Sequence, residues 1–155
     1  MTGWRIGFTY SSAELAKKMS AFQSHTTSNP STPAMEAALA AYSQRERAQE
    51  EVKRMKEAFR RRRDLVTRLF DELLPQLSYV KPEGAFYLYF RVDSLFREGR
   101  ADSGAVCRWL LEKAEVALVP GVAFGDDRYV RMSYATSDAL LEEGIRRLAR
   151  AVSES

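Results

Sequence analysis

Two arginine segments, near the two ends of the 155-residue chain, are the first candidates for chemistry. Arg5 lies in the sequence Gly-Trp-Arg-Ile-Gly (residues 3–7), and Arg131 lies in Tyr-Val-Arg-Met-Ser-Tyr-Ala (residues 129–135). A guanidinium group presents a planar fork of donors that suits phosphate or carboxylate oxygens. The glycines on either side of Arg5 would let a ligand approach the backbone closely. Anion binding is therefore one interpretation, and a plain surface charge is the other.

The other reactive side chains are one cysteine and one histidine. Cys107 stands on the apolar face of an expected helix, which is typical of a cysteine in a core rather than of a nucleophile. One cysteine excludes an internal disulfide framework and gives too few thiolates for a structural zinc site. His25 lies in a polar segment without an identifiable Ser, Cys or carboxylate constellation around it. We interpret His25 as solvated and expect no metal site.

Composition and charge indicate a globular protein without an affinity for nucleic acid or membranes. An apolar content of 45% in 155 residues can bury one ordinary core. The 24 basic and 21 acidic residues leave a net charge of +3, and both signs are mixed along the same predicted helices. The arginine run 60–63 shares its helix with several acidic residues, so we interpret it as a salt-bridged, solvated face. No signal peptide or membrane span is indicated, so we expect a cytoplasmic protein.

The first 44 residues predict a strand followed by two helices. Residues 4–10 are apolar and aromatic, which predicts a short buried strand. Ser12 and the acidic residue after it predict a helix over 13–22. Residues 24–33 are rich in Ser, Thr, Asn and Pro and predict a surface loop. A second helix is expected from Pro33 to residue 42, because proline suits the first turn of a helix.

A long helix is the clearest predicted element, from about residue 45 to residue 74. Apolar residues recur every seven positions, at Val52, Phe59, Val66 and Leu73. Arg62 interrupts the adjoining apolar ridge, which carries Met55, Leu69 and Phe70. A helix of about 30 residues is roughly 45 Å long at 1.5 Å per residue, which exceeds the diameter of a small domain. We therefore expect it to bend or to bridge two bodies.

The rest of the chain alternates between helices and strands. The predicted order is a strand over 85–90, a helix capped near residue 102, strands over 116–119 and 129–134, and a closing helix after Ser137. This order predicts an α+β fold in which a long helix leads a small sandwich of helices and strands. We expect two domains, at residues 1–44 and 45–155.

These segments, taken together and in order, resemble the C-terminal portion of a class I/II pyridoxal-phosphate-dependent aminotransferase of the aspartate aminotransferase type, fold type I. Residues 84–87, 119–121 and 124–125 also resemble family segments near the rim of the active-site cleft. The resemblance implies that residues 1–44 are a remnant of the large cofactor-binding domain and that 45–155 are the small C-terminal domain. It implies that Arg5 binds the cofactor phosphate and that Arg131 binds the α-carboxylate of the substrate.

The resemblance also implies an activity, namely amino-group transfer between an amino acid and a 2-keto acid through pyridoxal phosphate. In the family, the Schiff-base lysine stands a few residues before the segment around Arg5, which places it before Met1. The six lysines of the chain stand in other contexts: Lys17, Lys18, Lys53, Lys56, Lys81 and Lys113. We therefore expect no catalytic residue in this chain, no stable binding of pyridoxal phosphate by the chain alone, and negligible turnover alone. Around Ser24, aspartate-specific members of one subgroup carry a second arginine for the side-chain carboxylate, whereas this chain has Gln-Ser-His at residues 23–25, so the resemblance does not extend to dicarboxylate specificity.

Three hypotheses remain open. The chain is a C-terminal aminotransferase fragment that acts when joined to its missing N-terminal portion, or it is a stand-alone, non-catalytic module that oligomerises or binds a partner. A homo-oligomer would cover the apolar segment 4–8 by strand exchange. An RNA-binding α+β domain ranks last, because Ala85 and Glu83 depart from the signature that the aromatic strand 86–89 suggests.

Overall fold

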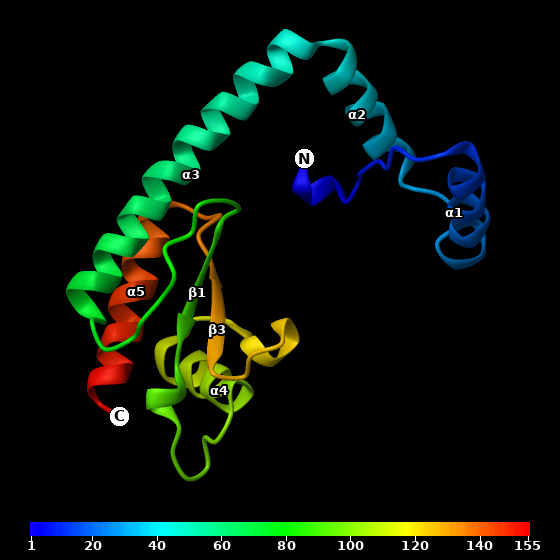
Figure 1. Cartoon of the computed structure of the whole chain (residues 1–155). Coiled ribbons are helices and arrows are strands. Elements are labelled where there is room, and N and C mark those ends of the chain that lie inside the picture. The colour runs from blue at the N-terminus through cyan, green and yellow to red at the C-terminus, as the bar shows by residue number, and fades with distance from the viewer. The chain divides into compact units, whose positions relative to one another are not determined.

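The long helix α3, Arg45–Leu73, links the two compact units of the chain. The computed structural model describes residues 1–155 apart from the side chain of Thr2. The units are Met1–Arg54 (unit 1) and Met55–Ser155 (unit 2), so their boundary falls within α3 (Figure 1). The helix therefore runs from one unit into the other, which is one of the two outcomes that its length suggested.

Unit 1 contains a short 3-10 helix, η1 (Thr2–Trp4), and two α-helices, α1 (Ala13–Thr26) and α2 (Thr32–Ser43). The Ser12 hydroxyl accepts a hydrogen bond from the backbone N–H of Leu15, which caps α1 as expected. The helix continues four residues past its predicted end. Ser24 and Thr26 belong to the last turns of α1, where their hydroxyls donate to backbone carbonyls of the preceding turn, so the predicted loop begins later than expected.

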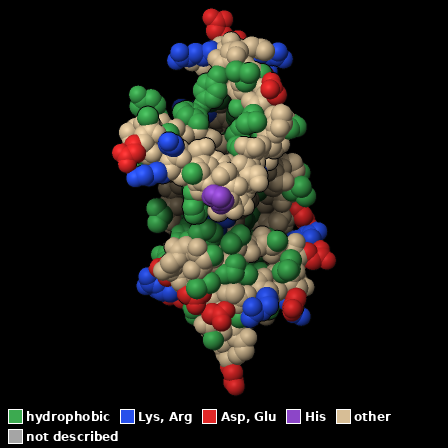
Figure 2. All heavy atoms as spheres, turned by 90° about the vertical axis from the view of Figure 1, so that its right-hand side faces the viewer, with side chains coloured by type: hydrophobic (Ala, Val, Ile, Leu, Met, Phe, Trp, Pro, Cys, Tyr) green, Lys and Arg blue, Asp and Glu red, His purple; other side chains and the backbone are tan. Residues whose placement is uncertain are grey.

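The prediction of a buried strand over residues 4–10 was wrong. These residues form the end of η1 and an irregular segment, and the side chains of Phe8 and Tyr10 are 77% and 98% exposed. Figure 2 shows apolar side chains at the surface of the protein. A strand is stable only when another strand pairs with its backbone, and apolar content does not supply that partner. Within the part of the chain that the structure describes, no strand pairs with this segment.

Unit 2 is a three-stranded antiparallel sheet with helices, and it confirms the α+β class. The strands are β1 (Tyr87–Arg91), β2 (Val119–Pro120) and β3 (Tyr129–Ser133), in the order β1-β3-β2. The helices are α4 (Ser103–Ala114) and α5 (Asp138–Ser153), with 3-10 turns η2 (Asp93–Leu95) and η3 (Gly121–Phe124). The predicted strand over 116–119 is largely wrong, because only Val119 and Pro120 pair with β3. Val116 and Leu118 pack against the core instead.

The two faces of the sheet differ in character. Leu88 and Phe90 of β1 and Val130 and Met132 of β3 are buried in one hydrophobic cluster, together with apolar residues of α3, α4 and α5. The alternate residues of the same strands point to the opposite face: Tyr87, Tyr89, Tyr129 and Arg131. In the register of β1 and β3, Leu88 lies opposite Met132 and Tyr89 lies opposite Arg131. Buried residues therefore pair with buried residues, and residues of the other face pair with one another. The helices therefore cover one face of the sheet and leave Arg131 on the other.

Ion pairs hold the start of α5 against α3. The Nε atoms of Arg61 and Arg62 donate to the carboxylate of Asp138 at 3.0 and 3.2 Å, and Arg63 pairs with Asp64. In Figure 1, α5 lies beside the C-terminal half of α3. These pairs confirm that the arginine run belongs to a salt-bridged face. In the described part of the chain, no helix is both long enough and apolar enough to span a membrane.

Candidate functional site

Arg131 lies between two aromatic rings on the open face of the sheet. The Cζ atom of its guanidinium is 4.1 Å from the centroid of the Tyr87 ring and 4.1 Å from that of Phe124. Both distances are within the range of an attractive cation–π interaction. The guanidinium carbon lies over the face of each ring, and the two rings form no aromatic pair with each other. They therefore contact the guanidinium from different sides.

The Nε atom of Arg131 is buried and has no hydrogen-bond partner. Within the described residues, Arg131 also makes no ion pair, so its charge is not neutralised by a carboxylate. Buried polar groups normally have partners, and an unpartnered one is a common mark of a ligand site. The guanidinium is thus held in place by rings and strands while its hydrogen-bonding capacity remains free.

A tight turn brings Phe124 to Arg131. Phe124 ends η3, and Gly125 follows with a φ of +90°, a left-handed conformation that favours glycine. At the start of η3, Gly121 is buried, and a Cβ atom there would overlap the backbone carbonyl oxygens of Asp126 and Tyr129. A larger residue at position 121 would therefore displace the turn that places Phe124.

Hydrogen bonds between Asp126 and Arg128 stabilise the same turn on the C-terminal side of Gly125. The carboxylate of Asp126 accepts hydrogen bonds from Nε and Nη2 of Arg128 at 2.9 and 2.6 Å, and from the Arg128 backbone N–H at 3.0 Å. These hydrogen bonds lower the pKa of Asp126 to about 2. The Tyr89 hydroxyl donates to the backbone carbonyl of Asp126 at 3.2 Å, and burial raises the pKa of Tyr89. The turn is therefore tied both to itself and to β1.

Arg5 lies in unit 1, immediately after η1. Its φ is +50°, in the left-handed region, and its side chain is exposed. A Cβ atom added to Gly3 or Gly7 would have no neighbouring atom within 4 Å, so the space beside Arg5 is open. Arg5 has no hydrogen bond or ion pair with the described side chains. Arg5 and Arg131 thus belong to different units of the chain.

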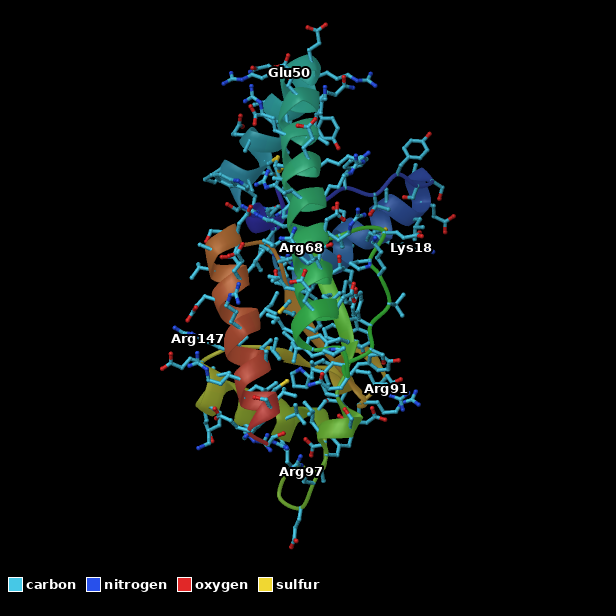
Figure 3. All side chains as sticks on the ribbon, turned by 90° about the vertical axis from the view of Figure 1, so that its left-hand side faces the viewer. Lys18, Glu50, Arg68, Arg91, Arg97 and Arg147 are labelled. Atoms are coloured by element: carbon cyan, nitrogen blue, oxygen red, sulfur yellow. The ribbon has the colours of Figure 1, made fainter. Side chains whose placement is uncertain are left out.

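The remaining candidate residues behave as the sequence indicated. Cys107 is buried in the core, and burial raises the pKa of its thiol to about 11. His25 is exposed near the end of α1. All six lysines are exposed, including Lys18, which Figure 3 labels and which pairs with Glu14. The raised pKa disfavours the thiolate that a nucleophilic Cys107 would need, and His25 and the lysines lack buried surroundings that would activate them.

Sequence reasoning missed the two rings that hold Arg131. Side chains alternate along β1 and β3, and this alternation places Tyr87, Tyr89 and Arg131 on the same face of the sheet. The contact between Tyr87 and Arg131 could therefore have been predicted from the sequence. The position of Phe124 depends on η3, and no periodic pattern in the sequence indicates that turn.

The comparisons with known proteins agree with one another. Residues 1–148 match the family model of class I and II aminotransferases. The chain is 43% identical over 153 residues to an aspartate aminotransferase of Bacillus subtilis, and 42% identical over 154 residues to a probable aspartate/prephenate aminotransferase of Aquifex aeolicus. These matches cover 98% and 99% of the chain but 38% of each relative. The solved structure of the Thermus thermophilus aspartate aminotransferase with maleate superposes with a TM-score of 0.83 at 38% identity, over 97% of this chain and 38% of that one.

Proposed function

Because the chain belongs to the class I and II aminotransferase family, we propose that it supplies two anion-binding arginines to an active site that transfers an amino group between an amino acid and a 2-keto acid. The chain spans about 38% of the length of its relatives, so this is a proposal about its contribution to a larger site. The observation that supports it best is the guanidinium of Arg131, which is held by two rings and has no partner among the described residues.

Arg131 binds the α-carboxylate of the amino acid in this proposal. Its planar fork can donate two parallel hydrogen bonds to the two carboxylate oxygens, which fixes the direction of the substrate as well as its position. Maleate, named with the Thermus thermophilus structure, carries carboxylates of this kind. Orientation is the main contribution of such a residue, because a substrate held in one pose reacts without a further entropic cost.

Arg5 binds the phosphate of pyridoxal phosphate in this proposal. The residues fit the group: Arg5 is free of partners among the described side chains, and the open space at Gly3 and Gly7 admits a phosphate beside the backbone. When bound, pyridoxal phosphate withdraws electrons from the α-carbon of the amino acid, and this makes the amino group transferable. Arg5 would hold the phosphate end, and Arg131 would hold the substrate end.

We also propose the domain division and the partners that the resemblance implies. Residues 1–44 belong to a large cofactor-binding domain, and residues 45–155 form the small domain. Unit 1 exposes many large apolar side chains, among them Phe8, Phe22 and Tyr42, which favours a packing partner for this unit. The partner is either the remaining part of the large domain or a second copy of the chain. Cytoplasmic location and a dimer remain predictions.

The role of Arg131 is tested in a chimaera that joins this chain to the preceding part of the Bacillus subtilis aspartate aminotransferase, in place of the segment that it matches. We expect Arg131→Gln to lower kcat/KM for the amino acid by about 30-fold to several thousand-fold, because the loss of one member of a buried charge pair costs about 2–5 kcal/mol. Arg108→Gln is the matched control, because Arg108 is exposed on α4. Equal kcat/KM values for the two variants would contradict the proposal.

The role of Arg5 is tested in the same chimaera through the cofactor. We expect Arg5→Gln to weaken the binding of pyridoxal phosphate and to leave the binding of pyridoxal, which has no phosphate, unchanged. Arg54→Gln serves as the control, because Arg54 is exposed and pairs with Glu51. An equal loss for both cofactor forms would show that Arg5 acts on something other than the phosphate.

A further inference from the structure

The immediate surroundings of Arg131 restrict how a ligand can reach it. Nε is the buried atom of the guanidinium, whereas the two Nη atoms are not among the buried, unpartnered atoms. The rings of Tyr87 and Phe124 lie over the group from different sides. A ligand can therefore reach the guanidinium at its Nη edge, which lies between two aromatic rings.

Each ring is itself supported by other aromatic residues. The Tyr87 ring is 4.6 Å from that of Phe86, which stacks on Phe59 of α3 at 5.4 Å. The Phe124 ring packs edge-to-face on Tyr89 at 6.3 Å, and Tyr89 stacks on Tyr129 at 4.8 Å. Such pairs stabilise the orientation of both partners. The rings that flank Arg131 are therefore not free to turn away independently.

We propose that Tyr87 and Phe124 form a slot that positions the Arg131 guanidinium and makes it selective for flat carboxylates over tetrahedral oxyanions. This inference rests on the proposed function of Arg131. A carboxylate presents both oxygens in the plane of the guanidinium and fits between the rings. A sulfonate bound through two of its oxygens places the third outside that plane, towards one of the two rings that lie over the guanidinium. Tyr87 and Phe124 are thus positioning residues that also determine specificity.

The slot also lowers the cost of binding. A free arginine side chain loses conformational freedom when a ligand fixes it, at a cost of about 3- to 10-fold in affinity for a rotamer-rich side chain. The rings restrict Arg131 before any ligand arrives, so this loss is avoided. Removal of one ring is expected to reintroduce it.

The experiment is a titration of the ¹⁵N-arginine-labelled 155-residue chain, followed by NMR at the Nε–H resonances. Arg131→Gln identifies the Arg131 signal by its disappearance. In the unaltered chain, ring currents should move this signal away from those of the exposed arginines, and acetate should shift it at lower concentration than methanesulfonate. We expect Tyr87→Leu and Phe124→Leu each to weaken acetate binding about 3- to 10-fold and to reduce the preference for acetate. Tyr87→Phe keeps the ring and should retain the original affinity and preference.

Val122→Ala is the matched control, because Val122 is exposed on the same turn as Phe124 but carries no ring. Phe124 is 45% exposed, so Phe124→Leu should fold, and the unchanged signals of the other arginines would verify this. If Phe124→Leu and Val122→Ala bind acetate and methanesulfonate equally well, the slot is overturned while the proposed function stands. If acetate does not affect the Arg131 signal in the unaltered chain, both the slot and the carboxylate role of Arg131 are overturned.

Discussion

At the scale of single residues, the candidate site depends on the turn between η3 and β3. Gly121 permits the turn, Phe124 extends from it, and Asp126 closes it through Arg128. The Arg131 site is therefore sensitive to a carboxylate that never needs to touch a ligand. Because this carboxylate can be protonated, the stability of the turn should depend on pH.

The pH response follows from the pKa of Asp126, which the hydrogen bonds from Arg128 lower from an ordinary value of 3.8 to about 2. A lowered pKa means that the folded state favours the ionised carboxylate, so this contribution to stability is fully present above pH 4. It is lost as the pH falls towards 2. We expect Asp126→Asn to lower the Tm at pH 7 and to have a much smaller effect near pH 2. Glu98→Gln is the control, because Glu98 is exposed. A Tm difference for Asp126→Asn that is equally large at both pH values would contradict this account.

At the scale of elements, α5 shows how one helix separates core from surface. Leu148 is 2% exposed and belongs to the hydrophobic cluster, whereas Leu140 on the same helix is 63% exposed. A leucine-to-alanine substitution at each position therefore separates the effect of burial on stability from the effect of helix propensity.

We expect Leu148→Ala to lower the free energy of unfolding by about 2–5 kcal/mol, because it removes buried methyl groups and leaves a cavity. Leu140→Ala should change it by no more than about 0.5 kcal/mol. Denaturant unfolding of the two variants measures the difference. Similar losses in both would mean that α5 does not pack on the core as described.

The helices were also the elements that the sequence predicted best. The apolar spacing in α3 and the capping residues Asp102 and Ser137 are local signals, and the structure confirms each of them. The strand predicted over 4–10 and most of the strand over 116–119 were wrong, because strand pairing depends on distant residues that no local pattern reveals. The contact between Phe124 and Arg131 was missed for the same reason: it depends on a turn that a glycine makes possible three residues earlier.

At the scale of the whole molecule, the chain combines family ancestry with a set of lysines that are all exposed. The cofactor-linking lysine of an aminotransferase must be positioned to move a proton at the substrate, and exposed helix and turn lysines are not held in that way. We therefore expect this polypeptide, on its own, to bind anions without moving a proton at a substrate.

We expect the purified 155-residue polypeptide to show no amino-group transfer when pyridoxal phosphate, an amino acid and a keto acid are added. Any absorbance change on cofactor addition should be spread over several exposed lysines and should survive the substitution of each one by arginine. A stoichiometric absorption band that a single Lys→Arg substitution removes would contradict this expectation.

The transaminase activity of the Bacillus subtilis chimaera tests the central claim most directly. If this chain carries the carboxylate-binding and phosphate-binding arginines of an aminotransferase, the chimaera should transfer amino groups between amino and keto acids at a rate that falls sharply in Arg131→Gln and not in Arg108→Gln. A folded chimaera that binds pyridoxal phosphate but transfers no amino group, or one whose rate is indifferent to Arg131, would contradict the account.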